Sequence, residues 1–202
     1  MMTFLFYLCS AYLIGSIPFG VFWSMGLSGR DPRQLGSHNI GMTNVWRVSG
    51  PYPGGLTLIC DVFKSALLIW MCPSEWTPDQ LAWIGLMAVL GHCYSAYLNF
   101  SGGKGVATAA GVLLSLSSGM FAISIGVWIA VRLMTGASSI ASLTAVLVCC
   151  MSSFWLWPAS MWPLFIILGI ISVRHRDNIV RIRDGTELDG SNPYQNDSST
   201  TI

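Results

Sequence analysis

The sequence contains few charged residues. Asp, Glu, Lys and Arg make up 9% of the 202 residues and apolar residues make up 53%, whereas a soluble domain carries about 25% charged residues. The mean hydropathy is +0.60. The net charge of +1 lacks the positive excess that binds nucleic acid, so we expect no nucleic-acid partner. This composition disfavours a disordered chain and a secreted disulfide scaffold, and it indicates a protein embedded in lipid.

The cysteines lack the spacing of a metal or redox site. No C-x-x-C pair occurs, and all six cysteines lie in apolar stretches, at Cys9, Cys60, Cys72, Cys93, Cys149 and Cys150. Metal and redox roles are therefore poorly supported, and we expect small, buried apolar side chains.

Stretches without charge predict several membrane spans. Residues 1–29, 81–103, 105–131 and 133–173 contain no Asp, Glu, Lys or Arg, and a bilayer core needs about 20 apolar residues per helix. The first stretch is too long for a cleaved secretory signal, so we expect it to be retained. The sequence predicts an all-α integral membrane protein with seven transmembrane helices, several of them short, over residues 3–26, 54–72, 80–98, 105–117, 119–134, 138–156 and 158–173.

The positions of Lys and Arg predict how the spans are oriented. Seven spans place every basic loop on the cytoplasmic side, whereas six would send the arginine-rich segment after residue 173 outside. The loop at 73–79 has no basic residue. We therefore predict an extracytoplasmic N-terminus, a cytoplasmic C-terminus and a single membrane domain over residues 1–187. The polar residues 188–202 are predicted to form a disordered cytoplasmic tail.

Three polar segments interrupt the apolar chain, and seven spans put all three on the cytoplasmic face. The first, Gly36–Arg47 (G-S-H-N-I-G-M-T-N-V-W-R), is predicted to be a glycine-bearing loop. Its backbone N–H groups, hydroxyls, amides and the Arg47 guanidinium suit phosphate binding. The alternative is an ordinary loop in which Asn and Ser form turns and Arg47 marks the cytoplasmic side.

The second polar segment, Gly91–Thr108, contains G-G-K-G just before an apolar run that begins at Val106. A helix N-terminus that follows glycines and Lys104 is a ready anion site. The spacing is not that of a nucleotide-binding loop, and the segment follows a membrane helix, not a strand. For His92, near the middle of the third span, we expect a buried histidine bonded to a neighbouring helix and not a general base.

The third polar segment, Arg174–Glu187, follows the last span directly. On a helix, His175 and Asn178 would share a face with Arg174 and Arg181 near it, so that donors could converge on a phosphate. Attraction of the arginines to anionic lipid is the alternative, although it does not explain His175 and Asn178.

Two charged residues, Asp61 and Lys64, lie inside the second span, where charges are costly. An ion pair that tethers helices and a role in a functional site are equal alternatives for them.

At these segments the chain resembles the bacterial acyl-phosphate:glycerol-3-phosphate acyltransferase (PlsY) family. The resemblance covers residues 11–187, from G-S-I-P through G-S-x-N-I-G-x-T-N-V-x-R, D-x-x-K and G-G-K-G-V-A-T to R-H-x-x-N-I-x-R-x-x-x-G-T-E. It implies transfer of an acyl group from acyl phosphate to the 1-hydroxyl of glycerol 3-phosphate, with release of lysophosphatidic acid and phosphate. It also implies an enzyme of phospholipid synthesis in the bacterial cytoplasmic (inner) membrane, without cofactor or metal, linked to the enzyme that makes acyl phosphate.

Matching positions carry the family's site onto this sequence. Ser37, Arg47, Lys104 and His175 are then implied as catalytic. The implied phosphate-binding residues are Ser37, Asn39, Asn44, Arg47, Gly102, Gly103, Lys104, Gly105, His175 and Asn178. The sequence departs from the family pattern at His38, where glycine is usual, and we expect this side chain near the substrate.

Two other classes of function would also gather basic residues on a membrane protein. A transporter or channel for an organic phosphate predicts a polar pathway across the whole bilayer, whereas the basic residues here fall on one predicted face. A noncatalytic scaffold that binds anionic lipid leaves G-G-K-G and the Asn-containing segment without a role. Acyl transfer accounts for all three polar segments, because both substrates carry phosphate.

Overall fold

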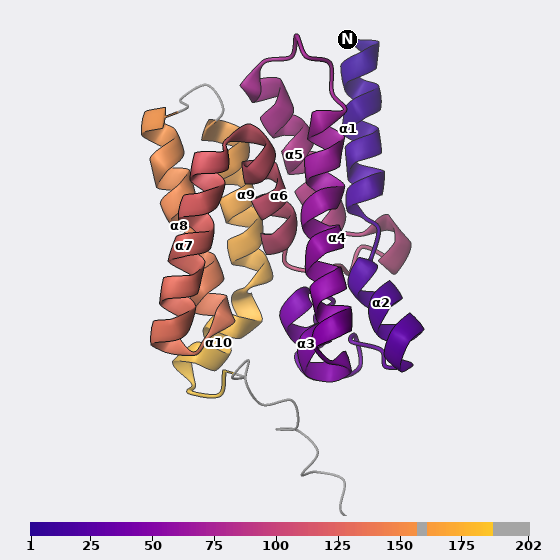
Figure 1. Ribbon diagram of the computed structural model, residues 1–202, viewed down its shortest axis with the longest axis vertical. Coiled ribbons are helices and arrows are strands. Elements are labelled where there is room, and N and C mark those ends of the chain that lie inside the picture. Colours follow the sequence, from indigo (N-terminus) through magenta and orange to yellow (C-terminus); the bar gives the residue numbers. More distant parts are fainter. Residues whose placement is uncertain (157–160, 188–202) are drawn as a thin grey trace, which may run out of the picture.

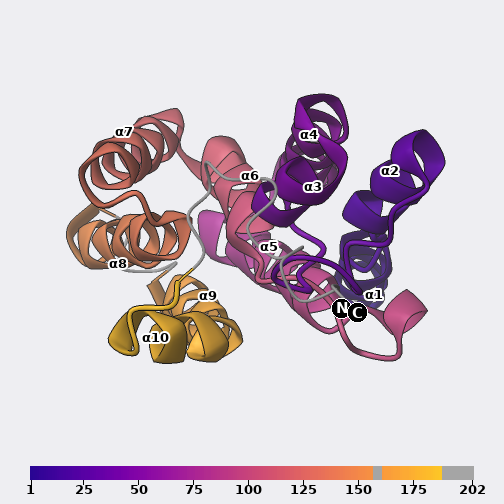
Figure 2. The same cartoon turned by 90° about the horizontal axis from the view of Figure 1, so that it is seen from below.

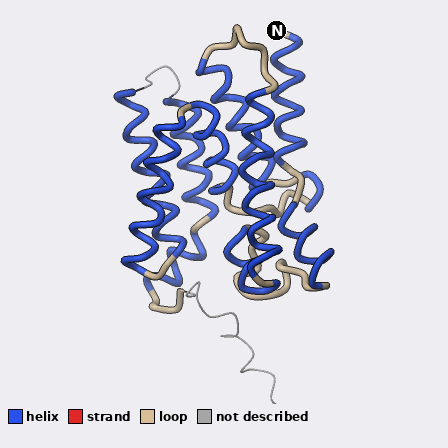
Figure 3. The backbone as a smooth tube through the Cα atoms, in the orientation of Figure 1, coloured by secondary structure: helices blue, strands red, loops and turns tan. Residues whose placement is uncertain are grey.

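The structure, a computed structural model, describes residues 1–156 and 161–187. Within these ranges every regular element is a helix (Figures 1 and 3). The helices are α1 (Met2–Gly15), α2 (Phe19–Ser28), α3 (Met42–Ser49), α4 (Pro51–Trp70), α5 (Pro78–Cys93), the 3₁₀ turn η1 (Ala96–Leu98), α6 (Val106–Leu116), α7 (Ser118–Thr135), α8 (Ser138–Leu156), α9 (Met161–Arg174) and α10 (Arg176–Arg183).

The apolar helices fall on the predicted spans. Within the described part of the chain, five segments are long and apolar enough to cross a membrane: Met2–Ser28, Pro51–Trp70, Pro78–Leu98, Ser118–Thr135 and Ser138–Trp155. The helices α6 and α9 are apolar but shorter. The long stretch 105–134 divides at Ser117, as predicted, and the Ser117 hydroxyl caps α7 by accepting from the N–H of Met120. The predicted class, an all-α integral membrane protein, is confirmed.

The span predicted over residues 3–26 is confirmed as the apolar segment Met2–Ser28, but this segment is two helices and not one. The helix α1 ends at Gly15 and α2 begins at Phe19, because Pro18 lacks an N–H and disfavours helical geometry in the residue before it. The carbonyl of Ile17 instead accepts a hydrogen bond from Lys64 Nζ at 3.2 Å. The break thus brings a backbone acceptor to a buried lysine of α4.

Small residues let the central helices pack at backbone contact. A Cβ atom at Gly15 would lie 2.2 Å from the carbonyl oxygen of Ala88, and one at Gly111 would lie 2.0 Å from that of Val62. The first contact joins α1 to α5 and the second joins α4 to α6, as is typical of membrane helices. Seen from below, α5 and α6 lie between the group α7, α8, α9 and the group α1, α2 (Figure 2).

The outer surface of the bundle carries large apolar side chains, among them Phe6, Leu133 and Trp155. Cys9 is also exposed, so the expectation that all six cysteines are buried is wrong at this position. Cys93, Cys149 and Cys150 are buried, and Cys60 and Cys72 are half-buried. An apolar surface of this kind is costly in water and suits contact with lipid.

The two ends of the bundle carry different short helices and connections. The helices α3 and α10 and the turn between α7 and α8 lie at the lower end in Figure 1, whereas the connection between α4 and α5 lies at the upper end, near the N-terminus. The first and third polar segments therefore share one end of the bundle. The predicted tail, 188–202, lies outside the described residues.

Candidate active site

The first polar segment is partly helical. Asn44 and Arg47 lie on α3 and not in a loop, so that expectation is wrong. The segment folds as a helix because Val45 and Val48, three residues apart, are both buried. Nδ2 of Asn44 lies 2.9–3.0 Å from the carbonyl oxygens of Pro32, Leu35 and Asn39, which share its two N–H donors. Its Oδ1 accepts from the N–H of Ser37 at 2.8 Å and from Arg47 Nη1 at 3.1 Å. Asn44 therefore fixes the preceding loop and positions the Arg47 guanidinium.

His38 lies away from the pocket described below. Its φ of 58° is in the left-handed region, which glycine adopts most readily. The side chain is exposed and its Nδ1 lies 3.1 Å from the carbonyl oxygen of Arg33. The expectation that this side chain lies near the substrate is therefore wrong. The unusual residue affects the backbone of the loop more than the pocket.

The G-G-K-G loop is held by α5 on one side and by α9 on the other. The N–H groups of Gly102 and Gly103 donate to the carbonyls of Cys93 and His92, at 3.1 and 2.9 Å. The guanidinium of Arg174 donates to the carbonyls of the same two glycines. Arg174 was expected near a phosphate, but its N–H groups instead hold this loop.

The glycine pair allows close packing against α5. A Cβ atom at Gly102 would lie 2.0 Å from the carbonyl oxygen of His92, and one at Gly103 would lie 2.1 Å from the Nε2 atom of the same histidine. Gly105 has a φ of 85° and forms the N-cap of α6, a geometry that disfavours other residues. The loop thus delivers Lys104 directly to the N-terminus of α6.

Lys104 joins the second polar segment to the third. Its Nζ donates to Oδ1 of Asn178 on α10. Burial lowers the pKa of Lys104 to about 8, and the Glu187 carboxylate opposes that shift in part. The cation is therefore partly desolvated, which strengthens its interaction with an anion.

His175 lies buried between α9 and α10. Its Nδ1 is 2.8 Å from the carbonyl oxygen of Ile171. A carbonyl can only accept, so Nδ1 carries the proton and Nε2 has a free lone pair. Burial and the charge of Lys104 lower the pKa of His175 to about 4. His175 is therefore neutral at pH 7 and offers an acceptor at Nε2.

Glu187 ties the third segment together. Its Oε1 accepts from Ser139 Oγ and from Asn178 Nδ2, both at 2.6 Å, and its Oε2 accepts from Arg181 Nε at 3.0 Å. These bonds hold the pKa of Glu187 below its ordinary value despite burial. Arg181, expected to contact a phosphate, is thus already paired with a carboxylate.

These elements enclose a pocket of about 320 Å³. Eight of the ten predicted site residues line it: Ser37, Asn39, Asn44, Arg47, Lys104, Gly105, His175 and Asn178. Gly102 and Gly103 are not among its lining residues in the described part of the chain; they pack against α5. Among the lining residues that the sequence did not single out for the site are Ser139 and Ser142, whose hydroxyls gave no signal within an apolar stretch.

Three buried polar side chains meet beside this pocket. Lys64 Nζ donates to Asp61 Oδ1 at 2.8 Å and lies 2.9 Å from His92 Nδ1. The expectation that His92 is buried and bonded to a neighbouring helix is confirmed, since Lys64 belongs to α4. The Asp61–Lys64 ion pair lies within α4, and Lys64 joins this helix to Ile17 and to His92 through its other two hydrogen bonds. Asp61 and His92 also line the pocket, and a role of the pair in the site stays a prediction.

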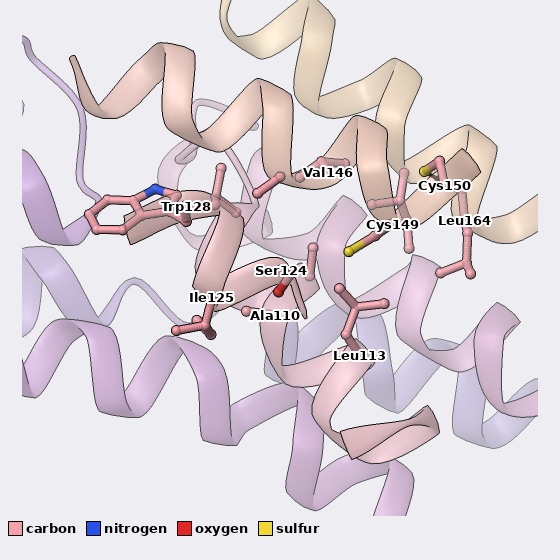
Figure 4. A pocket seen from close by; sticks show the side chains of 13 residues that line it. Ala110, Leu113, Ser124, Ile125, Trp128, Val146, Cys149, Cys150 and Leu164 are labelled. Carbon is pink, nitrogen blue, oxygen red and sulfur yellow. Dashed lines mark hydrogen bonds between the residues drawn. The ribbon is translucent and has the colours of Figure 1, made fainter. Parts of the chain in front are cut away.

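A second, apolar cavity of about 60 Å³ adjoins the first, and both are lined by Val106, Ala110, Ile125 and Trp128. It lies among α6, α7, α8 and α9, where Leu113, Val146 and Leu164 line it (Figure 4). Ser124 is its one lining residue with a side-chain oxygen or nitrogen besides Trp128. No polar pathway therefore leaves the main pocket in this direction within the described residues.

In residues 1–156 and 161–187, no three His, Cys, Asp or Glu side chains gather where they could hold a metal ion. The fold and the pocket define a helical membrane protein that places cationic groups next to an apolar cavity. A family profile described as glycerol-3-phosphate acyltransferase matches residues 5–185, and the chain belongs to this family.

Individual relatives agree with the family match. The glycerol-3-phosphate acyltransferase of Azotobacter vinelandii is 40% identical over 178 residues, which are 88% of this chain and 94% of that protein. That of Latilactobacillus sakei is 41% identical over 180 residues, 88% of this chain and 87% of that protein. The resemblance found in the motifs is thus confirmed.

Two solved structures have the same fold. The chain is 36% identical to PlsY (YgiH), an integral membrane glycerol 3-phosphate acyltransferase, in its glycerol 3-phosphate form, with a TM-score of 0.88 over 93% of this chain and 95% of the other. The lysophosphatidic acid form gives 33% identity and a TM-score of 0.83 with the same coverage.

Proposed function

We propose that this chain transfers an acyl group from acyl phosphate to the 1-hydroxyl of glycerol 3-phosphate, giving lysophosphatidic acid and phosphate. The observation that carries the proposal is the junction of a polar pocket containing Arg47 and Lys104 with an apolar cavity. Such a junction suits a substrate with a phosphate head and an acyl tail. The forms in which the similar protein was solved, with glycerol 3-phosphate and with lysophosphatidic acid, support the acceptor and the product.

The pocket offers two places for phosphate. Lys104 and the free N–H groups at the start of α6 lie beside the apolar cavity, since Val106 lines both spaces. We assign the phosphate of the acyl donor to this place. Arg47, with Ser37 and Asn39, lines another part of the pocket wall, and we assign the phosphate of glycerol 3-phosphate to it. Each cation reduces the repulsion between the two anions.

The transfer then depends on position more than on a strong protein base. The glycerol hydroxyl oxygen attacks the acyl carbonyl carbon, and the bond from that carbon to the phosphate oxygen breaks. His175, with a pKa of about 4, is a poor proton acceptor, whereas the second pKa of a phosphate is about 6. We therefore assign the hydroxyl proton to the departing phosphate. The Nε2 lone pair of His175 accepts a hydrogen bond from a glycerol hydroxyl and orients the acceptor.

The donor is a mixed anhydride and is already activated, so the proposed reaction calls for no metal or cofactor. The acyl tail would lie in the cavity among α6, α7, α8 and α9. We place the enzyme in the bacterial cytoplasmic membrane with its pocket on the cytoplasmic side, in phospholipid synthesis. A partner enzyme must supply the acyl phosphate.

The test is a turnover assay with purified protein, palmitoyl phosphate and glycerol 3-phosphate. We expect release of phosphate and lysophosphatidic acid in equal amounts, and no product when palmitoyl-coenzyme A replaces the donor. Arg47→Ala and Lys104→Ala should each lose most of the activity while remaining folded, since a charge-assisted contact is worth roughly 1.5 to 3 kcal/mol. Absence of turnover, or transfer from the thioester alone, would overturn the proposal.

A further inference from the structure

Lys64 has three hydrogen-bond acceptors around its ammonium group. They are the carbonyl of Ile17 at 3.2 Å, Oδ1 of Asp61 at 2.8 Å and Nδ1 of His92 at 2.9 Å. A lysine ammonium has three N–H donors and no acceptor. The three donors of Lys64 are therefore all used, and one of them points at His92.

This arrangement determines which nitrogen of His92 carries the proton. A nitrogen that accepts from an ammonium group cannot itself hold a proton, so Nδ1 is bare and Nε2 carries the hydrogen. The competing arrangement would have Nδ1 donate to Asp61 Oδ1, but that distance is 3.5 Å, longer than a good hydrogen bond. The shorter contact to Lys64 therefore sets the tautomer.

The Nε2–H group of His92 has a place to donate. It makes no hydrogen bond to residues 1–156 or 161–187, although His92 is 4% exposed. The side chain lines the main pocket, and Nε2 lies against Gly103, directly before Lys104. A ring N–H that reaches a pocket and has no protein partner is available to donate to a ligand or to water there.

We propose that His92 is a substrate-binding residue whose Nε2–H donates to an oxygen of the acyl donor, with Lys64 as the positioning residue that fixes the tautomer. This inference rests on the proposed function. It assigns to His92 a hydrogen-bond donor role that is the opposite of the acceptor role of His175.

The acyl donor is the substrate nearest to His92. The Gly103 that touches Nε2 leads into the N-terminus of α6, where Val106 and Ala110 line both the pocket and the apolar cavity. The head of a molecule whose tail fills that cavity would lie beside these residues. Glycerol 3-phosphate has no apolar tail, so no contact with the apolar cavity would hold it beside these residues. Because the Asp61 carboxylate is paired with Lys64, it does not leave an uncompensated negative charge beside the incoming phosphate.

The tautomer can be measured without any catalysis. The chain has three histidines, so the imidazole resonances of protein labelled with ¹⁵N-histidine can be assigned with His38→Gln and His92→Gln. We expect the His92 proton on Nε2 and the His175 proton on Nδ1. Palmitoyl phosphonate, in which a carbon–phosphorus bond prevents phosphate from leaving, should shift the His92 Nε2–H resonance, whereas glycerol 3-phosphate alone should not. A proton on Nδ1 of His92, or no response to the phosphonate, would overturn the proposal.

Two variants separate binding from structure. In His92→Gln the amide can place a donor near the position of Nε2, whereas in His92→Asn it can only replace Nδ1 as the acceptor for Lys64. We expect His92→Asn to lower kcat/KM for palmitoyl phosphate about tenfold or more, the scale of a hydrogen bond to a charged oxygen. We expect His92→Gln to retain more activity, and the KM for glycerol 3-phosphate to change little in both.

The outcomes for His92 and for the proposed function differ. If the wild type turns over palmitoyl phosphate and His92→Asn has wild-type kinetics, His92 is structural and the proposed function stands. If the phosphonate shifts the His92 resonance but no transfer occurs, the binding site stands and the proposed function fails. Should either variant fail to fold, the resonances of the wild type still decide the tautomer.

Discussion

Lys104 changes charge within the pH range of ordinary assays, because burial lowers its pKa to about 8. The ammonium form binds phosphate and predominates below this pKa. We therefore expect kcat/KM of the wild type to fall as the pH rises through about 8, since this parameter reports the free enzyme. In Lys104→Arg the fall should vanish, because a guanidinium stays protonated up to about pH 12.

The control for Lys104 is the fall of kcat/KM at alkaline pH. If this fall were unchanged in Lys104→Arg, the ionisation behind it would belong to another group. Should that variant be inactive, calorimetric binding of palmitoyl phosphonate to the wild type between about pH 7 and 9 tests the same ionisation. The acidic side is less informative, because the phosphates of both substrates titrate near pH 6 or so.

His175 should respond to substitution in a pattern that depends on its bond to Ile171. Asn at this position can replace Nδ1 and donate to that carbonyl, but it leaves no acceptor where Nε2 stands. Gln can place an oxygen near Nε2. We expect His175→Asn to lower kcat/KM for glycerol 3-phosphate by about 2- to 12-fold, the scale of one neutral hydrogen bond, and His175→Gln to lose less. Equal kinetics of His175→Asn and the wild type would exclude contact between Nε2 and substrate.

At the scale of single residues, sequence identified the charged groups better than it identified their contacts. Lys104 and His175 line the pocket as expected, because polar residues in an apolar chain need a reason to be there. The direction of Arg174 towards the G-G-K-G carbonyls depends on how α9 meets α5, which no local pattern encodes. The pocket-lining role of His92 was missed for the same reason.

The element α3 shows what periodicity cannot resolve. The glycines and the turn-forming Asn and Ser of the first polar segment favoured a loop, yet eight consecutive residues that begin within it form a helix. The contact of α3 with α4 decides otherwise: a Cβ atom at Gly54 would lie 2.8 Å from Cβ of Trp46. The longer apolar helices were predictable because each is an uncharged stretch long enough to cross a bilayer. The break at Pro18 could have been predicted as well, because proline has no N–H.

The packing of α4 against α6 should be sensitive to a single methyl group. A Cβ atom at Gly111 would lie 2.0 Å from the carbonyl oxygen of Val62, so Gly111→Ala must push the helices apart. We expect a loss of about 1 to 3 kcal/mol in stability, measured by thermal unfolding in detergent. Activity should fall as well, because the N-terminus of α6 would move away from the pocket.

Gly55 provides the matched control on the same pair of helices. A Cβ atom at Gly55 of α4 would meet nothing within 4 Å, and alanine favours a helix over glycine by up to about 1 kcal/mol. Gly55→Ala should therefore unfold at the same temperature as the wild type or higher. If both substitutions had the same effect on thermal unfolding, the close contact of α4 and α6 would not be what stabilises the fold.

For the whole molecule, the two ends of the bundle should be distinguishable by labelling. Gln34, in the connection before α3, and Ser74, in the connection between α4 and α5, are both exposed. We expect a membrane-impermeant maleimide to reach Ser74→Cys from outside and Gln34→Cys from the cytoplasm, each in a cysteine-free background. The basis is the absence of Lys and Arg from 73–79. Labelling of Gln34→Cys from outside would reverse the orientation.

The wall that α7 contributes to the main pocket has a kinetic consequence. Ile125 and Ile129 line the main pocket and are also exposed on α7, so we expect the pocket to open towards the lipid beside this helix. The rate would then depend on the concentration of glycerol 3-phosphate in water and on the surface density of palmitoyl phosphate in the membrane. Adding inert lipid at constant total palmitoyl phosphate should slow the reaction by surface dilution. The concentration of glycerol 3-phosphate needed for half-maximal rate should stay the same.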